Sequence, residues 1–127
     1  MKTVENGITH HEQVTPTDAD LASALGNTGV DVVSSPATIA YLERVAMHAL
    51  EPYYEDDEAT VGVGFNFRHL SAAFPGSPVN VTAELIDQKP PLFTFRVEAR
   101  QNDRIIMTGE HERAVVNLSR FLSKAGA

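Results

Sequence analysis

One stretch of the chain, SSPATIAYLERVAMHALEP, carries a helical pattern of apolar positions. Ser34 or Ser35 can cap the free N–H groups of its first turn, and Pro36 suits the first helical position, where no N–H is needed. Pro52 predicts an end near Glu51. The pattern therefore predicts one long helix from Pro36 to about Glu51.

A carboxylate interrupts the apolar stripe of this helix. On a wheel of about 100° per residue, the stripe contains Ile39, Leu42, Ala46, Ala49 and Leu50. Glu43 lies about 40° from Ile39, inside the stripe. Because a buried and unpaired carboxylate is unfavourable, we expect Glu43 to have a hydrogen-bond or charge partner, or a chemical role.

A period of two replaces the helical pattern in the second half of the chain. It predicts four strands over Thr60–Leu70, Val79–Leu85, Phe93–Arg100 and Arg104–Val116, with a weaker first strand at Ile8–Val14. Short helices are predicted at Asp18–Leu25 and Asn117–Lys124. Short connections make consecutive strands antiparallel, and one long helix must cover their apolar face. The pattern thus predicts an α+β fold, with a curved antiparallel sheet wrapped around one long central helix.

The strand Thr60–Leu70 has an unusual apolar face. By the period of two, this face contains Val61, Val63, Phe65, Phe67 and His69. It therefore ends in a histidine. Gly62 and Gly64 weaken a strand, but they allow a ligand or another backbone to come close.

Composition excludes several classes of function. A length of 127 residues predicts a single domain over residues 1–127. The net charge of −7, without a Lys/Arg run, makes nucleic acid and anionic membrane surfaces poor partners. No apolar run is long enough to span a membrane and no secretory signal is evident, so we expect a cytoplasmic location. The absence of cysteine excludes thiolate ligands and cysteine nucleophiles.

Two polar segments are expected to be solvated surface. His10 and His11 are neighbours in a strand, so they point to opposite faces and cannot chelate one metal together. The acidic stretch Glu55–Glu58 lacks the spaced, convergent oxygens of a divalent-cation site. No metal site is therefore predicted.

Three residues on facing elements form a candidate catalytic set. A glutamate and a histidine in a partly dry pocket, here Glu43 and His69, can act as orienter and base or as nucleophile and acid. Ser35 lies at the helix start, where free N–H groups favour an oxyanion or a polarised carbonyl. Each also has a structural interpretation: a helix cap, a hydrogen-bonded histidine at a strand end, and a carboxylate paired with a surface arginine.

Four segments carry motifs of a known family in the same order and at compatible spacing: Ser35–Ala46, Thr60–Gly62, Arg68–Ala73 and Gly109–Val116. Together they resemble the hot-dog thioesterases of the fluoroacetyl-CoA thioesterase type. The resemblance spans roughly Val32 to Val116 and implies a hot-dog fold.

The resemblance also implies a site and a partner. It places the family's catalytic hydroxyl, carboxylate and imidazole on Ser35, Glu43 and His69. The backbone N–H of Gly62 would hold the thioester carbonyl, with Pro36 and Arg68 as further substrate-binding residues. A homodimer is implied, with acyl-CoA bound at the subunit interface, and a tetramer stays open. No metal or redox cofactor is implied.

Two departures from the family affect the expected substrate. Ser35 replaces the usual threonine, and Gly26–Gly29 offers no counterpart of the aromatic lid of the fluoroacetyl-specific enzyme. We therefore expect hydrolysis of a small or medium acyl-CoA to free acid and CoA. His111 and Arg113 share one strand face, and we expect a structural role for both.

Three alternatives remain at this point. The chain could bind an acyl-CoA or another apolar small molecule without hydrolysing it, or act as a hydratase or dehydratase on an acyl thioester. It could also adopt the cone-shaped α+β fold of the ketosteroid isomerase kind, which usually offers several helices before its sheet. For hydrolysis, a covalent glutamyl anhydride and direct attack by water are both open.

Overall fold

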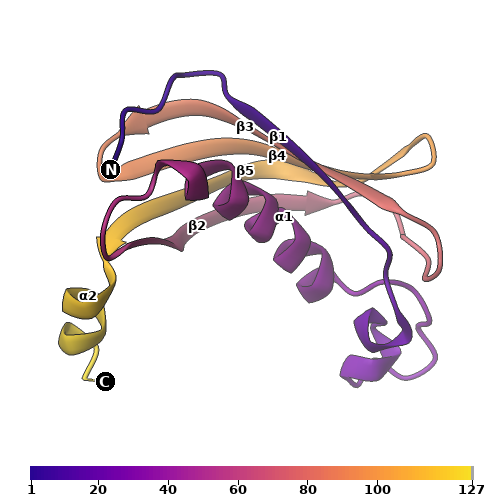
Figure 1. Ribbon diagram of the computed structural model, residues 1–127. Coiled ribbons are helices and arrows are strands. Elements are labelled where there is room, and N and C mark those ends of the chain that lie inside the picture. The colour runs from indigo at the N-terminus through magenta and orange to yellow at the C-terminus, as the bar shows by residue number, and fades with distance from the viewer. Residues whose placement is uncertain (127) are drawn as a thin grey trace.

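The computed structural model describes residues 1–126, and Ala127, the last residue of the predicted domain, lies outside them. Its five strands are β1 (Thr9–Val14), β2 (Glu58–His69), β3 (Val79–Lys89), β4 (Leu92–Gln101) and β5 (Arg104–Asn117). They form one antiparallel sheet in the order β1-β3-β4-β5-β2, so β1 and β2 are its two edges. The sheet curves over the long helix α1 (Ser35–Leu50), which confirms the predicted architecture (Figure 1).

Helix α1 begins one residue earlier than predicted, because Ser34 is its cap. The Oγ atom of Ser34 accepts a hydrogen bond from the Ala37 N–H at 3.1 Å. Such a cap contributes about 1 kcal/mol to helix stability. The hydroxyl of Ser35 therefore has no capping role and stays available for another contact.

The core lies between α1 and the inner face of the sheet. Helix α1 buries seven residues: Thr38, Tyr41, Leu42, Val45, Ala46, Ala49 and Leu50. Strands β3 and β4 bury every second residue: Val79, Val81, Ala83, Leu85, Phe93, Phe95, Val97 and Ala99. The period of two in these strands is thus confirmed as alternation between core and solvent.

Strand β2 contains a β-bulge that the period of two does not predict. Gly62 pairs with Arg113 and Gly64 pairs with Glu112, so Val63 is one extra residue on β2. The bulge reverses the alternation of faces from this point onward.

Because of the bulge, the residues that share a face of β2 differ from those predicted. Paired residues of an antiparallel ladder lie on the same face of the sheet. Gly62 therefore shares the inner face with Phe65, which pairs with the buried His111. Val61 pairs with Ala114 and lies on the outer face, so the prediction that it shares a face with Phe65 is wrong.

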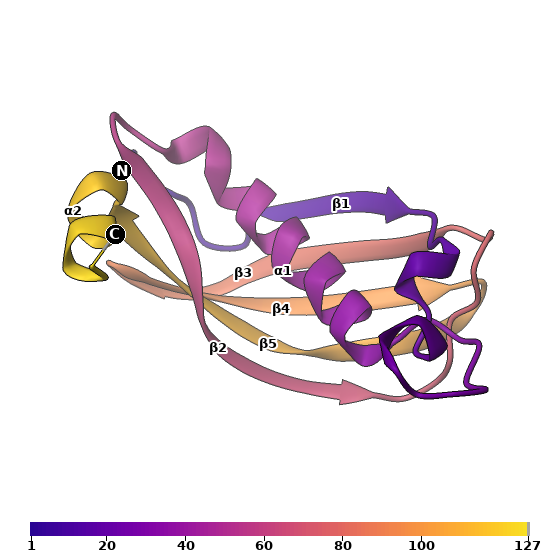
Figure 2. The same cartoon turned by 90° about the horizontal axis from the view of Figure 1, so that it is seen from below.

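The remaining elements lie at the two ends of the sheet. The predicted helix at Asp18–Leu25 is instead two 3₁₀ turns, Asp18–Asp20 and Ser23–Leu25, beside the start of α1 (Figure 2). A third 3₁₀ turn, Glu51–Tyr53, follows α1. The short helix α2 (Leu118–Lys124) follows β5 and is capped by Asn117.

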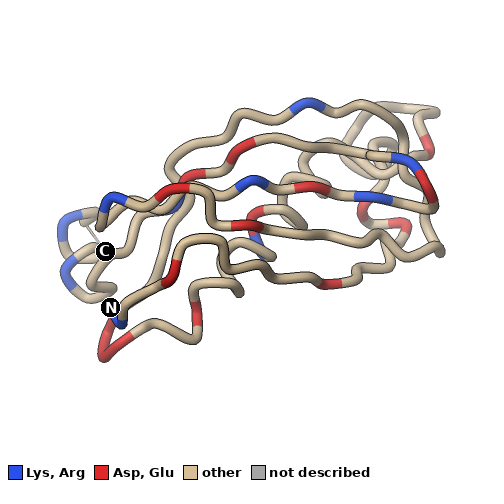
Figure 3. The backbone as a smooth tube through the Cα atoms, turned by 90° about the horizontal axis from the view of Figure 1, so that it is seen from above, with Lys and Arg blue, Asp and Glu red and all other residues tan. Residues whose placement is uncertain are grey.

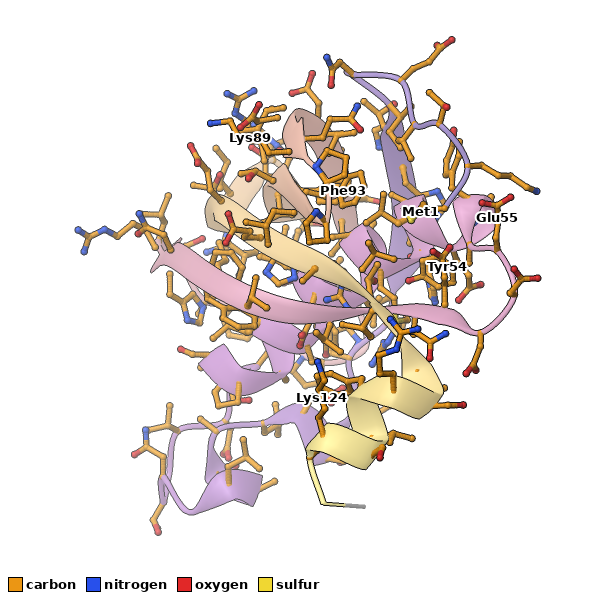
Figure 4. All side chains as sticks on the ribbon, turned by 90° about the vertical axis from the view of Figure 1, so that its left-hand side faces the viewer. Met1, Tyr54, Glu55, Lys89, Phe93 and Lys124 are labelled. Atoms are coloured by element: carbon orange, nitrogen blue, oxygen red, sulfur yellow. The ribbon has the colours of Figure 1, made fainter. Side chains whose placement is uncertain are left out.

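The acidic stretch after α1 is mostly exposed, as predicted, and its carboxylates also make specific contacts. The amino group of Met1 lies 2.9 Å from a carboxylate oxygen of Glu55 and 2.9 Å from one of Glu58. Figure 4 shows Met1 and Glu55 on neighbouring segments. Asp57 accepts hydrogen bonds from the N–H and hydroxyl of Ser119, which lower the pKa of Asp57. Contacts of these carboxylates therefore connect the chain start and α2 to the segment that leads into β2.

Figure 3 shows residues of both charge signs distributed over the strands. On β3 and β4, Arg96 contacts Glu84 at 2.9 Å and Arg100 contacts Glu98 at 2.7 Å. Within residues 1–126, no helix has the length and apolar character needed to cross a membrane. The cytoplasmic location stays a prediction.

Candidate active site

Two of the three predicted catalytic residues are in direct contact. Ser35 is in the first turn of α1, and His69 is the last residue of β2. The Oγ atom of Ser35 lies 2.6 Å from Nδ1 of His69, within hydrogen-bond distance. Both residues are exposed. The start of the helix and the end of the edge strand thus bring a hydroxyl and an imidazole together.

Glu43 lies two turns further along α1, at the rim of the core. Its side chain is 39% exposed, so the carboxylate is not inside the buried stripe. The expected partner is Arg113 of β5, whose Nη1 atom lies 3.4 Å from Oε2 of Glu43. Within residues 1–126, no hydrogen bond joins the Glu43 carboxylate to Ser35 or His69.

Arg113 is a buried arginine and not the surface partner that the sequence left open. Its side chain is 4% exposed. It donates from Nε to the hydroxyl of Thr60 at 3.0 Å and from Nη2 to the carbonyl of Thr60 at 2.8 Å. Burial lowers the pKa of Arg113, and the nearby charge of Glu43 opposes this shift. The planar guanidinium is therefore held rigidly beside the Glu43 carboxylate.

His111 supports Arg113 from the same strand face. Its Nε2 atom lies 3.1 Å from Nη1 of Arg113, and its Nδ1 atom lies 2.9 Å from the carbonyl oxygen of Gly64. An arginine only donates and a carbonyl only accepts, so Nδ1 carries the proton and the ring is neutral. Burial lowers the pKa of His111, in agreement with that state. Its ring also stacks on Phe65, with centroids 4.7 Å apart.

Gly62 lies against the Glu43 carboxylate. A Cβ atom at position 62 would collide with Oε2 of Glu43 and would lie 2.8 Å from the ring of Phe65. This close approach explains why a glycine occupies a strand position. The close approach expected at Gly62 is therefore to a side chain of α1.

The other two predicted substrate-binding residues lie apart from Glu43. Pro36 is exposed beside Ser35 in the first turn of α1. Arg68 is exposed and pairs with Thr108, so it faces away from His69 on the outer side of β2. Arg68 is thus next to His69 in the sequence, but its side chain lies on the opposite face of the sheet from the contact between Ser35 and His69.

A pocket and an apolar edge flank these residues. The pocket has a volume of about 260 Å³ and is lined by Ala40, Glu43, Arg44, Met47 and Arg113. Strand β2 exposes 50% of Val63 and 51% of Phe65 at the edge of the sheet. Glu43 therefore faces solvent in a pocket close to the edge strand β2, which carries exposed apolar side chains.

The contact between Arg113 and Glu43 was not predicted from the sequence. The alternating pattern of the strand correctly placed His111 and Arg113 on one face. The contact with Glu43 depends on the pairing of Arg113 with Gly62, which the bulge at Val63 sets. A glycine two residues before another glycine was the available signal of such an irregularity.

Known proteins resemble this chain over most of its length. A family described as "Fluoroacetyl-CoA-specific thioesterase" matches residues 14–119. A fluoroacetyl-CoA thioesterase of Streptantibioticus cattleyicolor is 33% identical over 94 residues, which cover 74% of this chain and 68% of that protein.

Solved structures agree with that match. The crystal structure of a single-site variant of the fluoroacetyl-CoA-specific thioesterase superposes with a TM-score of 0.92 at 25% identity, covering 98% of this chain and 97% of that one. The same variant in complex with fluoroacetate and CoA gives a TM-score of 0.89 at 26% identity, covering 93% and 99%. These neighbours confirm the predicted hot-dog fold and exclude the cone-shaped alternative. The chain belongs to the fluoroacetyl-CoA-specific thioesterase family.

Proposed function

We propose that this protein is a homodimeric acyl-CoA thioesterase that hydrolyses a small or medium acyl-CoA to the free acid and CoA. The observation that carries the proposal is the Glu43 carboxylate, half-exposed beside Gly62 and held by the buried Arg113. Membership of a thioesterase family and the CoA complex of a similar structure support the same substrate class.

The hydroxyl and imidazole have complementary roles in this proposal. The 2.6 Å contact between Ser35 Oγ and His69 Nδ1 fixes the orientation of the ring. The second ring nitrogen, Nε2, is then the atom that exchanges a proton with water or with the departing thiolate. Backbone N–H groups at Gly62 or at the start of α1 polarise the thioester carbonyl.

The carboxylate of Glu43 acts at the carbonyl carbon by one of two routes. It attacks directly and forms an anhydride that water then cleaves, or it orients the water that attacks. In either route the C–S bond breaks, the sulfur accepts a proton, and an oxygen from water ends in the acid. Arg113 fixes the direction of the carboxylate through its other hydrogen bonds, to Thr60 and His111.

Dimerisation through β2 would complete the site. Within one chain the Ser35–His69 pair and the Glu43–Arg113 pair share no hydrogen bond in residues 1–126. Strand β2 is an edge strand with exposed Val63 and Phe65, a surface that a second copy can cover. We propose that acyl-CoA binds along that interface. Pro36 and Arg68 are the proposed contacts outside the reacting centre.

The test is thiol release from a panel of acyl-CoAs, from acetyl to long-chain and aryl. We expect the wild type to release thiol and both Glu43→Gln and His69→Ala to lose activity by about 10²–10⁴-fold. Glu51→Gln, an exposed glutamate at the end of the same helix, is the matched control and should keep wild-type activity. Near-wild-type rates in both site variants, with unchanged circular dichroism, would contradict the proposal.

The same panel separates the alternatives. A binder that does not hydrolyse would release no thiol, while CoA esters would still raise its melting temperature. A hydratase would add water across a double bond and leave CoA attached to the product. Product analysis by mass spectrometry distinguishes these outcomes.

A further inference from the structure

Three metal-ligating side chains meet at the other edge of the sheet. His10 and Glu12 are two residues apart on β1, so they share one strand face. This face is turned to α1, where His48 lies in the last turn. Nδ1 of His48 is 2.7 Å and 3.0 Å from the two carboxylate oxygens of Glu12, and Nε2 of His10 is 3.5 Å from one of them.

The three side chains have the geometry of an ion-binding group. One ligand atom from each residue lies within 4.8 Å of the other two. Ligands of a tetrahedral zinc ion, at bond lengths of about 2.0–2.2 Å, stand roughly 3.3 Å apart. The two distances to Glu12, 2.7 Å and 3.5 Å, lie on either side of that separation. Small side-chain rotations therefore suffice to place one ion between the three groups.

We infer that His10, Glu12 and His48 bind one divalent transition-metal ion, and that Zn²⁺ is the ion that suits them. Two imidazoles and one carboxylate are ligands that zinc accepts, with the fourth tetrahedral position left to water. Calcium and magnesium prefer sites built from oxygen alone. The bound ion joins β1 to α1 and so stabilises the edge of the sheet.

The surroundings of the group favour entry of a cation. The side chains of His10, Glu12 and His48 are 39%, 27% and 31% exposed, so an ion can reach them from solvent. The net charge of the chain is −7, which attracts cations. His11 faces the other side of β1, where its ring nitrogen contacts the Thr82 hydroxyl at 3.0 Å, and it is no ligand.

The inferred site is separate from the proposed active site. Strands β1 and β2 are opposite edges of the sheet, and Figure 2 shows them on the two sides of α1. The hydrolysis proposed above uses no metal. The metal site and the thioesterase activity can therefore be tested, and can fail, independently.

The experiment uses the untagged full chain after removal of metals with a chelator. Titration with ZnCl₂ in a calorimeter should give one Zn²⁺ per chain, and ZnCl₂ should raise the melting temperature while MgCl₂ should not. CoCl₂ serves as an optical probe, since visible absorption bands of tetrahedral Co²⁺ should appear on binding. His10→Ala and His48→Ala should each weaken Zn²⁺ binding at least tenfold, whereas the matched control His11→Ala should bind as the wild type does.

His10→Ala is the decisive variant, because it leaves the hydrogen bond between Glu12 and His48 in place and should fold normally. Zn²⁺ affinity in His10→Ala equal to that of the wild type would overturn the inference. So would less than one ion per wild-type chain at saturation, which is expected if the three side chains form only a hydrogen-bonded contact between β1 and α1.

Discussion

The two edges of the sheet differ in what they expose. The edge strand β1 carries polar contacts on both faces, with His48 of α1 on one side and Thr82 of β3 on the other. The edge strand β2 is bulged and exposes Val63 and Phe65. Polar and charged side chains protect an edge strand against pairing with another chain, and apolar ones do not. The asymmetry agrees with the proposal that β1 makes contacts within the chain while β2 contacts substrate and a second copy.

The largest expected difference between the edges is in catalysis. His69→Gln at the end of β2 removes the imidazole proposed to exchange protons and should lower kcat by about 10²–10⁴-fold. His11→Gln on β1 removes an exposed imidazole that faces away from α1, so kcat should not change. Steady-state thiol release measures both variants. Equal loss of activity in the two would mean that His69 has no special role.

The second difference concerns assembly. Val63→Lys places a charge on the exposed apolar edge of β2 and should weaken the proposed dimer by about 30-fold or more, since loss of a central interface contact costs about 2 kcal/mol or more. Gln13→Lys on β1 is the matched change at an exposed position and should leave the dimer intact. Sedimentation or light scattering across a dilution series gives the dissociation constants. A Val63→Lys dimer as tight as the wild type would place the interface elsewhere.

The third prediction concerns two glycines within β2. Gly62→Ala pushes a methyl group into the space of the Glu43 carboxylate, and a displacement of about 1 Å can lower a rate about 100-fold. Gly64→Ala places its methyl 3.2 Å from Cβ of Glu112, away from Glu43, and should have a smaller effect on kcat. If Gly64→Ala lowers kcat as much as Gly62→Ala while both proteins keep their melting temperatures, the contact with Glu43 is not what limits the rate.

The smallest expected effect is on stability against pH. Burial lowers the pKa of His111 below its ordinary value of 6.5, so the folded protein binds fewer protons there than the unfolded chain. Its contribution is therefore fully present above about pH 6.5 and is lost as the pH falls toward the lowered value, by at most about 1.4 kcal/mol per pH unit. Urea unfolding from pH 7.5 down to pH 5 measures this slope. His111→Gln should have a flatter profile over that range, and an unchanged profile would assign the slope to other groups.

The fold was largely predictable from local patterns. The apolar stripe of α1 and the alternation in β3 and β4 indicated the elements, and short connections indicated the antiparallel sheet. The single extra residue at Val63 was missed, because alternation alone carries no information on pairing register and only the glycines at 62 and 64 signalled an irregularity. For that reason Val61 was assigned to the wrong face of β2.

The candidate site was predictable as residues but not as contacts. Ser35, Glu43 and His69 stood out as polar groups on faces expected to meet. The partner of Glu43 depends on the register of β5 against β2, and the group of His10, Glu12 and His48 depends on β1 lying at the sheet edge beside α1. Neither register nor strand order follows from the spacing of residues along the chain.

The neighbouring serines at the start of α1 divide two tasks between them. Ser34 closes the helix end through Ala37, and Ser35 reaches His69. Because separate hydroxyl groups make these two contacts, a substitution at position 35 leaves the helix cap at Ser34 intact. The residue at position 35 can therefore change between serine and threonine, both of which carry a hydroxyl, while Ser34 keeps the helix at its starting point.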